Sequence, residues 1–270
     1  MFVLDDQITA LITFLTGCGS GVYIGIASGT AEPFIIPLMT ILISSTIYQA
    51  IGTSLFVDCV IGLVAGLIFF KKGHVNLKPV VILAVSGVLF AFIGTFFSQG
   101  AREGDLKLLI AVVLIMFGII LLRGGVKKNV EYVNDKVNIE WFRKHRQLVF
   151  LLTGSLIGFA SGFTGMGSSG AMTIILIFVM GYDLHTSIGT SLMMMSFIGF
   201  TGAVAHGSLG HIVLDSALIA GVGAAVGAVS GSFFANKINE DLLGRVIGGI
   251  ITLLGFIVLI ELIASGQLFS

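Results

Sequence analysis

One unit occurs twice along this chain. The segment Ile51–Leu55 reads Ile-Gly-Thr-Ser-Leu and returns at Ile188–Leu192, 137 positions later. The same ungapped offset pairs Gly73-His74 with Gly210-His211. Further residues share this offset: Gly21 with Gly158, Gly25 with Gly162, Gly94 with Gly231, and Phe97 with Phe234. The repeat therefore predicts a fold made of two copies of one unit, packed against each other.

The composition indicates that these copies lie in a lipid bilayer. Hydrophobic residues make up 56% of the chain, charged residues only 10%, and the mean hydropathy is +1.09. A soluble domain carries roughly 25% charged residues. We therefore expect an all-α, polytopic membrane protein, because helices satisfy their own backbone hydrogen bonds in lipid. We expect no nucleic-acid partner.

Ten apolar segments divide evenly between the two copies. They cover 8–27, 33–47, 51–70, 79–99 and 106–122 in the first half, and 148–165, 170–181, 188–206, 212–235 and 242–263 in the second. A polar, basic stretch separates the halves. We therefore predict a first membrane repeat at 1–122, a cytoplasmic linker at 123–147 and a second membrane repeat at 148–270.

The second segment of each half is too short to span a bilayer, which takes about 20 helical residues. The polar turns before these segments, 28–32 and 165–170, should therefore lie inside the membrane, where broken backbone is tolerated only if protein or water covers it. Segments one and two would form a broken or re-entrant hairpin in each half. Three spans follow each hairpin, so each half crosses an odd number of times and the repeats have inverted topology.

The positive charges test this topology. With both termini outside and the linker inside, the inner side receives most of the cations, as the positive-inside rule requires. The inner residues are Lys71, Lys72, Lys78, Arg123, Lys127, Lys128, Lys136, Arg143, Lys144, Arg146, Lys237 and Arg245, and the outer ones are Arg102 and Lys107. The sequence thus predicts a multi-pass protein of the cell membrane with this orientation.

The two polar turns are the first candidates for a binding site. A helix that begins after such a turn has N–H groups without intrahelical partners and a partial positive charge, which together favour an anion. Thr30, Ser168 and Ser169 would add hydroxyl donors, and two inverted copies would direct both turns at one central point. The alternative is that these residues only permit tight turns and close packing.

The repeated Gly-Thr-Ser-Leu motif has two interpretations. Thr53, Ser54, Thr190 and Ser191 could cap the helices that start there, since Thr and Ser are favoured N-cap residues. Their occurrence in both copies also allows them to line the substrate path.

Ionisable residues within apolar segments are costly and suggest function. Glu32 and Asp58 are the candidates for carrying a coupling proton or binding a cation. Their partners across the repeat are Ser169 and Met195, so neither belongs to a duplicated site. His206 is also unpaired, whereas His74 and His211 pair at Gly-His turns, where a role in the turn is favoured over a role as ligand.

The chain carries no enzyme signature. The metal-spaced His/Glu cluster of a metalloprotease, the nucleophile elbow and the Walker phosphate loop are all absent from the sequence. We expect no enzymatic activity, no cofactor and no metal site.

From Leu11 to Ile263 the sequence resembles the sulfite exporter TauE/SafE family of membrane permeases. The resemblance rests on the duplicated polar turn before a short helix, on Pro33 and Pro37 after the first turn, and on the Gly-Thr-Ser-Leu motif in both copies. It implies transport of small anions such as sulfite or organosulfonates. It also implies a substrate site formed by Gly25, Gly29, Thr30, Gly162, Gly165, Gly167, Ser168 and Ser169, with Thr53, Ser54, Thr190 and Ser191 beside them.

We therefore predict a secondary transporter, acting as an exporter, that moves a small sulfur-containing anion by alternating access around a central site. Protons are the candidate coupling partner. Two alternatives stay open at this point. One is a cation-coupled transporter or channel with Glu32 and Asp58 as ligands, and the other is a membrane scaffold that transports nothing.

Overall fold

The computed structural model describes residues 6–98, 139–165, 169–237 and 240–264, with seven single helical residues between 108 and 122. Its elements are α1 (Asp6–Ala27), α2 (Glu32–Pro37), the π-helical turn η1 (Leu38–Leu42), α3 (Ile47–Lys71), α4 (Leu77–Phe97), α6 (Ile139–Lys144), α7 (Arg146–Thr164), α8 (Ser169–Phe178), α9 (Leu184–Ser208), α10 (Leu214–Ala235) and α11 (Glu240–Ala264). Within these residues every regular element is a helix. Six of them (α1, α3, α4, α7, α9 and α10) are long and apolar enough to cross a membrane. The predicted all-α, multi-pass membrane protein is confirmed.

The helix boundaries repeat with the same offset as the sequence. Moved by 137 positions, the bounds of α3 coincide with those of α9, and the first residue of α2 coincides with that of α8. Backbone with positive φ also occurs in pairs at this offset: Ser28 with Gly165, Ser44 with Gly181, and Gly73 with Gly210. The duplication in sequence is therefore a duplication of local structure.

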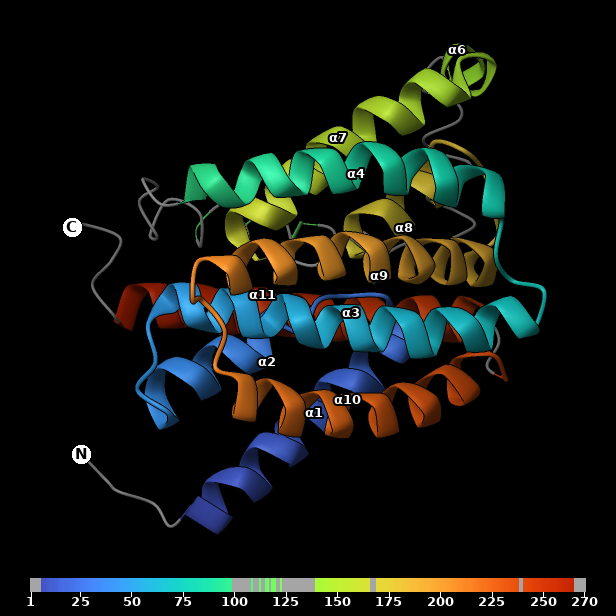
Figure 1. Cartoon of the computed structure of the whole chain (residues 1–270). Helices are drawn as coiled ribbons and strands as arrows, with labels where there is room; N and C mark the ends of the chain where they lie inside the picture. Colours follow the sequence, from blue (N-terminus) through green and yellow to red (C-terminus); the bar gives the residue numbers. More distant parts are fainter. Residues whose placement is uncertain are drawn as a thin grey trace.

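α3 and α9 form the centre of the molecule and run in opposite directions (Figure 1). Gly52, near the start of α3, lies against His206 near the end of α9. Gly189, near the start of α9, lies against Phe69 near the end of α3. These two contacts are equivalent under the repeat, so each helix presents the same surface to the other.

Two parallel helix pairs flank this centre, α1 with α10 and α4 with α7 (Figure 1). Gly17 faces the backbone of Ala220, and its repeat partner Gly154 faces the backbone of Leu83. A side chain at either glycine would collide with the neighbouring backbone, so the close helix approach requires them. Small residues at helix interfaces serve the same purpose in membrane proteins generally.

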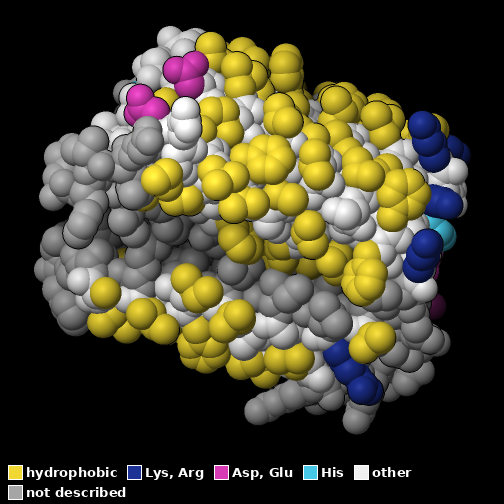
Figure 2. Space-filling view, turned by 90° about the horizontal axis from the view of Figure 1, so that it is seen from below, with side chains coloured by type: hydrophobic (Ala, Val, Ile, Leu, Met, Phe, Trp, Pro, Cys, Tyr) yellow, Lys and Arg dark blue, Asp and Glu magenta, His cyan; other side chains and the backbone are white. Residues whose placement is uncertain are grey.

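The surface divides along the helix direction. Figure 2 shows apolar side chains across the middle of one face, with Lys and Arg gathered toward one end and acidic side chains present at both ends. One end of the molecule is basic. The end of α3 and the start of α9 lie there because these helices are antiparallel, and α4 and its parallel partner α7 start there because α4 follows α3. The described cations are Lys71, Lys72, Lys78, Arg143, Lys144, Arg146, Lys237 and Arg245. Six cations of the orientation prediction (Arg102, Lys107, Arg123, Lys127, Lys128 and Lys136) lie outside the described residues.

Candidate functional site

The helix break between α1 and α2 meets the start of α8, beside the central α3–α9 pair. Ser169, the first residue of α8, donates its hydroxyl to the Gly29 carbonyl at 2.6 Å. Gly170 lies directly against the backbone of Ser28 and Gly29. The break in the first copy is therefore in contact with the short helix of the second copy, in a region where Ser28, Thr30 and Ser169 are all buried.

A cluster of three hydroxyl groups lies at this contact. The Oγ of Ser28 is 2.8 Å from Oγ1 of Thr173 on α8 and 2.8 Å from Oγ of Ser191 on α9. Thr173 and Ser191 are themselves 2.5 Å apart. We call Ser28, Thr173 and Ser191 the hydroxyl cluster. It joins both copies, and the polar groups satisfy one another inside an apolar surrounding, where an unpaired hydroxyl would be costly.

Ser28 has a left-handed backbone, with φ +53°. Its repeat partner, Gly165, has φ +78° and ends α7. The amide of each donates to the carbonyl four residues earlier, Ile24 and Ser161, both at 2.8 Å. Left-handed backbone costs about 1–2 kcal/mol for residues other than glycine. In the first copy, Ser28 therefore carries backbone strain that glycine would avoid, and it supplies a hydroxyl that glycine lacks.

Asp58 binds the first break through both carboxylate oxygens. Oδ1 accepts the Ala31 amide at 2.8 Å, and Oδ2 accepts the Thr30 hydroxyl at 3.2 Å. Asp58 is fully buried midway along α3. The Thr30 hydroxyl predicted to bind an external anion thus binds an anionic side chain of the protein itself.

The corresponding position in the second copy is apolar. Met195 takes the place of Asp58 and is buried. Ser54, the repeat partner of Ser191, is fully buried, and its hydroxyl has no hydrogen-bond partner. The two breaks are therefore alike in backbone at their described edges, Ser28 with Gly165 and Glu32 with Ser169, and different in chemistry.

The two threonines of the repeated motif bind loops. Thr53 accepts the amide of Val213 at 3.4 Å, and Thr190 accepts the amide of Asn76 at 3.0 Å. Each bond ties one central helix to the loop that precedes α10 or α4. The N-cap interpretation of the motif is wrong, because α3 and α9 begin six residues before Thr53 and Thr190.

The actual caps explain this earlier start. Thr46 and Gln49 form a capping box at α3, and the Asp183 carboxylate accepts the Thr186 amide at 2.8 Å at α9. The helices thus continue through the motif. Its glycines Gly52 and Gly189 make room for the backbone carbonyls of His211 and His74, and they also lie against the facing central helix.

The remaining predicted residues divide into several groups. Gly25 and Gly162 pack against the backbones of Ala228 and Ala91 in the parallel helix pairs. Glu32 is the first residue of α2 and is half-buried, and its amide donates to Thr30. Gly167 and Ser168 lie outside the described residues.

Sequence reasoning missed Ser28 and Thr173 as site residues. Ser28 was available as the residue before Gly29 in the first turn. Thr173 lies one helical turn after Ser169, on the same face of α8, because residues four apart are neighbours on a helix. Its partner Ser191 lies 18 positions further along the chain, so only the tertiary packing brings the cluster together.

Comparison with known proteins decides the family. Residues 13–258 match the family described as sulfite exporter TauE/SafE. The chain belongs to this family. A probable membrane transporter protein of Xylella fastidiosa is 27% identical over 245 residues, which cover 89% of this chain and 91% of that protein. One from Methanocaldococcus jannaschii is 22% identical over 274 residues, covering 96% and 97%.

A shorter match with higher identity comes from Bacillus subtilis. Its probable membrane transporter protein YdhB is 34% identical over 115 residues, or 43% of this chain and 47% of YdhB. No solved structure matches the chain. Family and relatives together identify this TauE/SafE protein as a membrane transporter, which agrees with the six apolar helices of membrane-spanning length among the described residues.

Proposed function

We propose that this protein is a secondary transporter that exports small sulfur-containing anions, such as sulfite or organosulfonates, by alternating access around a central site. The observation that carries the proposal is the buried contact between the first helix break and α8. It brings hydroxyl groups from both copies together at the centre of a membrane protein. A scaffold has no use for broken helices there, because unpaired backbone in a membrane is costly.

Inverted topology is supported by the reciprocal α3–α9 contact. Repeat-equivalent helices that pack against each other antiparallel are related by a two-fold axis perpendicular to their length. Such an axis lies in the membrane plane when the helices cross the membrane, as in transporters with inverted repeats.

Re-entrant hairpins are supported by helix length. α2 and η1 together contain 11 residues and α8 contains 10. At 1.5 Å per residue these segments extend about 15 Å, half of a hydrocarbon core about 30 Å thick. The basic end would face the cytoplasm under the positive-inside rule, with both termini outside.

The anion would bind beside the hydroxyl cluster, at the start of α8. The first amides of this ten-residue helix are suitable donors for an oxyanion, and the hydroxyls of Ser169, Thr173 and Ser191 would join them once the first break moves away from α8. The Asp58 carboxylate already accepts the donors of the first break, whereas Met195 leaves no negative charge at the equivalent position. The two breaks would thus have different roles, one for the substrate and one for the coupling ion.

Asp58 is the better candidate for proton coupling. It is buried at the middle of α3, while Glu32 is half-buried at a helix start. Both Asp58 oxygens accept hydrogen bonds, which argues against direct cation coordination in this conformation. A proton arriving at Asp58 would weaken its bonds to Thr30 and Ala31 and so loosen the first break.

Flux into proteoliposomes tests the proposal. The purified protein would be reconstituted, and uptake of sulfite, sulfoacetate, taurine, sulfate and a small carboxylate compared. We expect saturable flux of a sulfur anion that Ser191→Ala lowers at least about tenfold, the effect of losing one charge-assisted hydrogen bond. Thr201→Ala serves as the matched control, since Thr201 is half-buried on the same helix, away from the cluster, and bonds the Phe197 carbonyl. Absence of flux for every anion would refute the proposal.

A further inference from the structure

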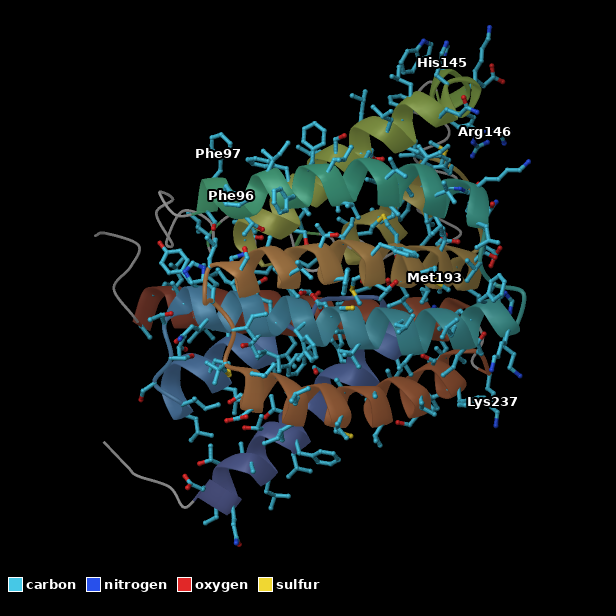
Figure 3. The ribbon with its side chains drawn as sticks, in the orientation of Figure 1. Phe96, Phe97, His145, Arg146, Met193 and Lys237 are labelled. Carbon is cyan, nitrogen blue, oxygen red and sulfur yellow. The ribbon has the colours of Figure 1, made fainter. Side chains whose placement is uncertain are left out.

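A small basic cavity lies at one end of the parallel α4–α7 pair. Its volume is about 70 Å³, enough for a group of several heavy atoms. It is lined by Asn76, Lys78, Pro79, Ile82, Arg146, Gln147, Phe150 and Tyr182. Figure 3 shows Arg146 at this end, directly after His145 at the start of α7. None of these residues belongs to the central site.

The two cations of the cavity, Lys78 and Arg146, lie at helix starts, where the positive end of the helix dipole disfavours a positive charge. Lys78 is the second residue of α4 and Arg146 is the first residue of α7. Neither helix has an acidic residue in its first turn. The positive ends of two parallel helix dipoles and two cationic side chains therefore converge on one cavity, an arrangement that an anion would stabilise.

Neutral groups of the cavity add directional donors. The Asn76 amide donates to the Tyr182 phenol oxygen at 3.2 Å. Burial raises the pKa of Tyr182, and Arg146 partly offsets this rise. The phenol therefore keeps its proton and can donate it to a ligand. Two cations and one hydroxyl around a small cavity are typical donors for a tetrahedral oxyanion.

The repeat supplies an internal comparison. The equivalent pair, α1 with α10, has Asp6 and Asp215 in its first turns. Asp215 takes the place of Lys78 under the offset of 137, and Thr9 takes the place of Arg146. The helix pairing itself thus needs no cation at this position. The positive-inside rule favours cations at the basic end, and here two of them line the same cavity.

We infer that this cavity binds the phosphodiester headgroup of an anionic phospholipid from the leaflet at the basic end. The cavity lies at the ends of membrane-spanning helices, which is the depth of lipid headgroups. Basic pockets between helices on the cytoplasmic side bind such headgroups in other membrane proteins.

An apolar groove beside the cavity fits the rest of a lipid. It has a volume of about 510 Å³ on the other flank of α4, and Leu77, Val81 and Val85 line it together with Met193 and Phe197 of α9. Leu77 follows Asn76 and precedes Lys78, so the groove and the cavity begin at the same helical turn. An acyl chain in this groove and a phosphate at Lys78 can belong to one molecule.

Native mass spectrometry and thermal unfolding of the full chain in detergent test the inference. The probes are phosphatidylglycerol, phosphatidylcholine, inorganic phosphate and sulfite. We expect phosphatidylglycerol to bind and stabilise, and its affinity to fall at least about tenfold in Lys78→Gln/Arg146→Gln, because each cation near a membrane surface contributes measurably to anionic-lipid binding. Lys71→Gln/Lys72→Gln is the matched control. It removes the same charge from the same end, at exposed positions outside the cavity.

Each result bears on the inference. Retained affinity in the control, and in Lys78→Arg/Arg146→Lys, supports a specific headgroup site. An equal loss in the control would mean general charge attraction and overturn it. Stabilisation by inorganic phosphate or sulfite at least equal to that by phosphatidylglycerol would assign the cavity to free anions. Unfolding temperatures measured without anionic lipid establish that each variant is folded.

Discussion

The two helix breaks occur at equivalent positions of the repeat but carry different residues. The second copy has glycine at the left-handed position, and the first has Ser28. The second has Met195 where the first has Asp58. Because the described backbone repeats while these side chains differ, the shared fold does not require either set of side chains.

Ser28→Gly and Ser44→Gly form a matched pair of variants. Both remove left-handed strain, since Ser44 has φ +54° and Ser28 has φ +53°. Ser44 is exposed, so its change should leave the free energy of unfolding unchanged or raise it by up to about 1 kcal/mol. Ser28→Gly also loses the bonds to Thr173 and Ser191, so it should be less stable than Ser44→Gly by about 1 kcal/mol or more.

Thermal unfolding and anion flux of the two variants check this prediction. Flux should fall for Ser28→Gly alone. If both variants behave alike, the Ser28 hydroxyl contributes nothing beyond backbone shape, and the hydroxyl cluster is not part of the transport path.

Asp58→Asn tests the proposed proton coupling. The amide keeps an oxygen for the Ala31 amide but carries no titratable charge. We expect transport to continue at a reduced rate and to lose its response to an imposed pH gradient. Glu32→Gln should keep that response. A pH response retained by Asp58→Asn and lost by Glu32→Gln would transfer the coupling role to Glu32.

At the scale of elements, the sequence predicted more of the helices than of their contacts. The ten apolar segments agree with the helices to within a few residues where the structure describes them, because long hydrophobic runs determine them. The apolar segments begin four residues after the true starts of α3 and α9, because polar caps at Thr46 and Asp183 extend both helices beyond the apolar run. The hydroxyl cluster was not predictable from spacing, because it combines a turn, α8 and α9.

Glycine spacing on α1 and α7 shows which contacts hold these elements. A Cβ at Gly158 would meet the backbone of Gly87 on α4, whereas a Cβ at Gly19 of α1 meets nothing within 4 Å. Gly158→Ala should therefore force α7 away from α4 and destabilise the protein by about 2 kcal/mol or more, as overpacking does. Gly19→Ala should be neutral or stabilising by up to about 1 kcal/mol, since alanine favours helix.

Unfolding temperatures of the two variants, measured in one detergent, test this prediction. Equal behaviour of Gly158→Ala and Gly19→Ala would mean that the parallel pair tolerates a wider separation than the structure indicates.

At the scale of the molecule, the two copies meet through surfaces that are equivalent under the repeat. A two-fold arrangement of this kind permits two states related by the two-fold rotation, one open to each side, since exchanging the conformations of the copies exchanges the open side. Under the proposed alternating access, the contact between the first break and α8 would separate and re-form during each cycle. Residues that differ between copies, such as Lys78 and Asp215, make the two sides chemically unequal.

A disulfide across the hydroxyl cluster tests this cycle. Ser28 and Thr173 have hydroxyl oxygens 2.8 Å apart, so cysteines at these positions can bond after small adjustments. The background would carry Cys18→Ala and Cys59→Ala, because both native cysteines are free thiols. Oxidation of Ser28→Cys/Thr173→Cys should stop anion flux, and reduction should restore it. Each single cysteine should transport equally under both conditions. Full flux through the oxidised, cross-linked protein would mean that the copies stay together at this contact, and alternating access around it would have to be abandoned.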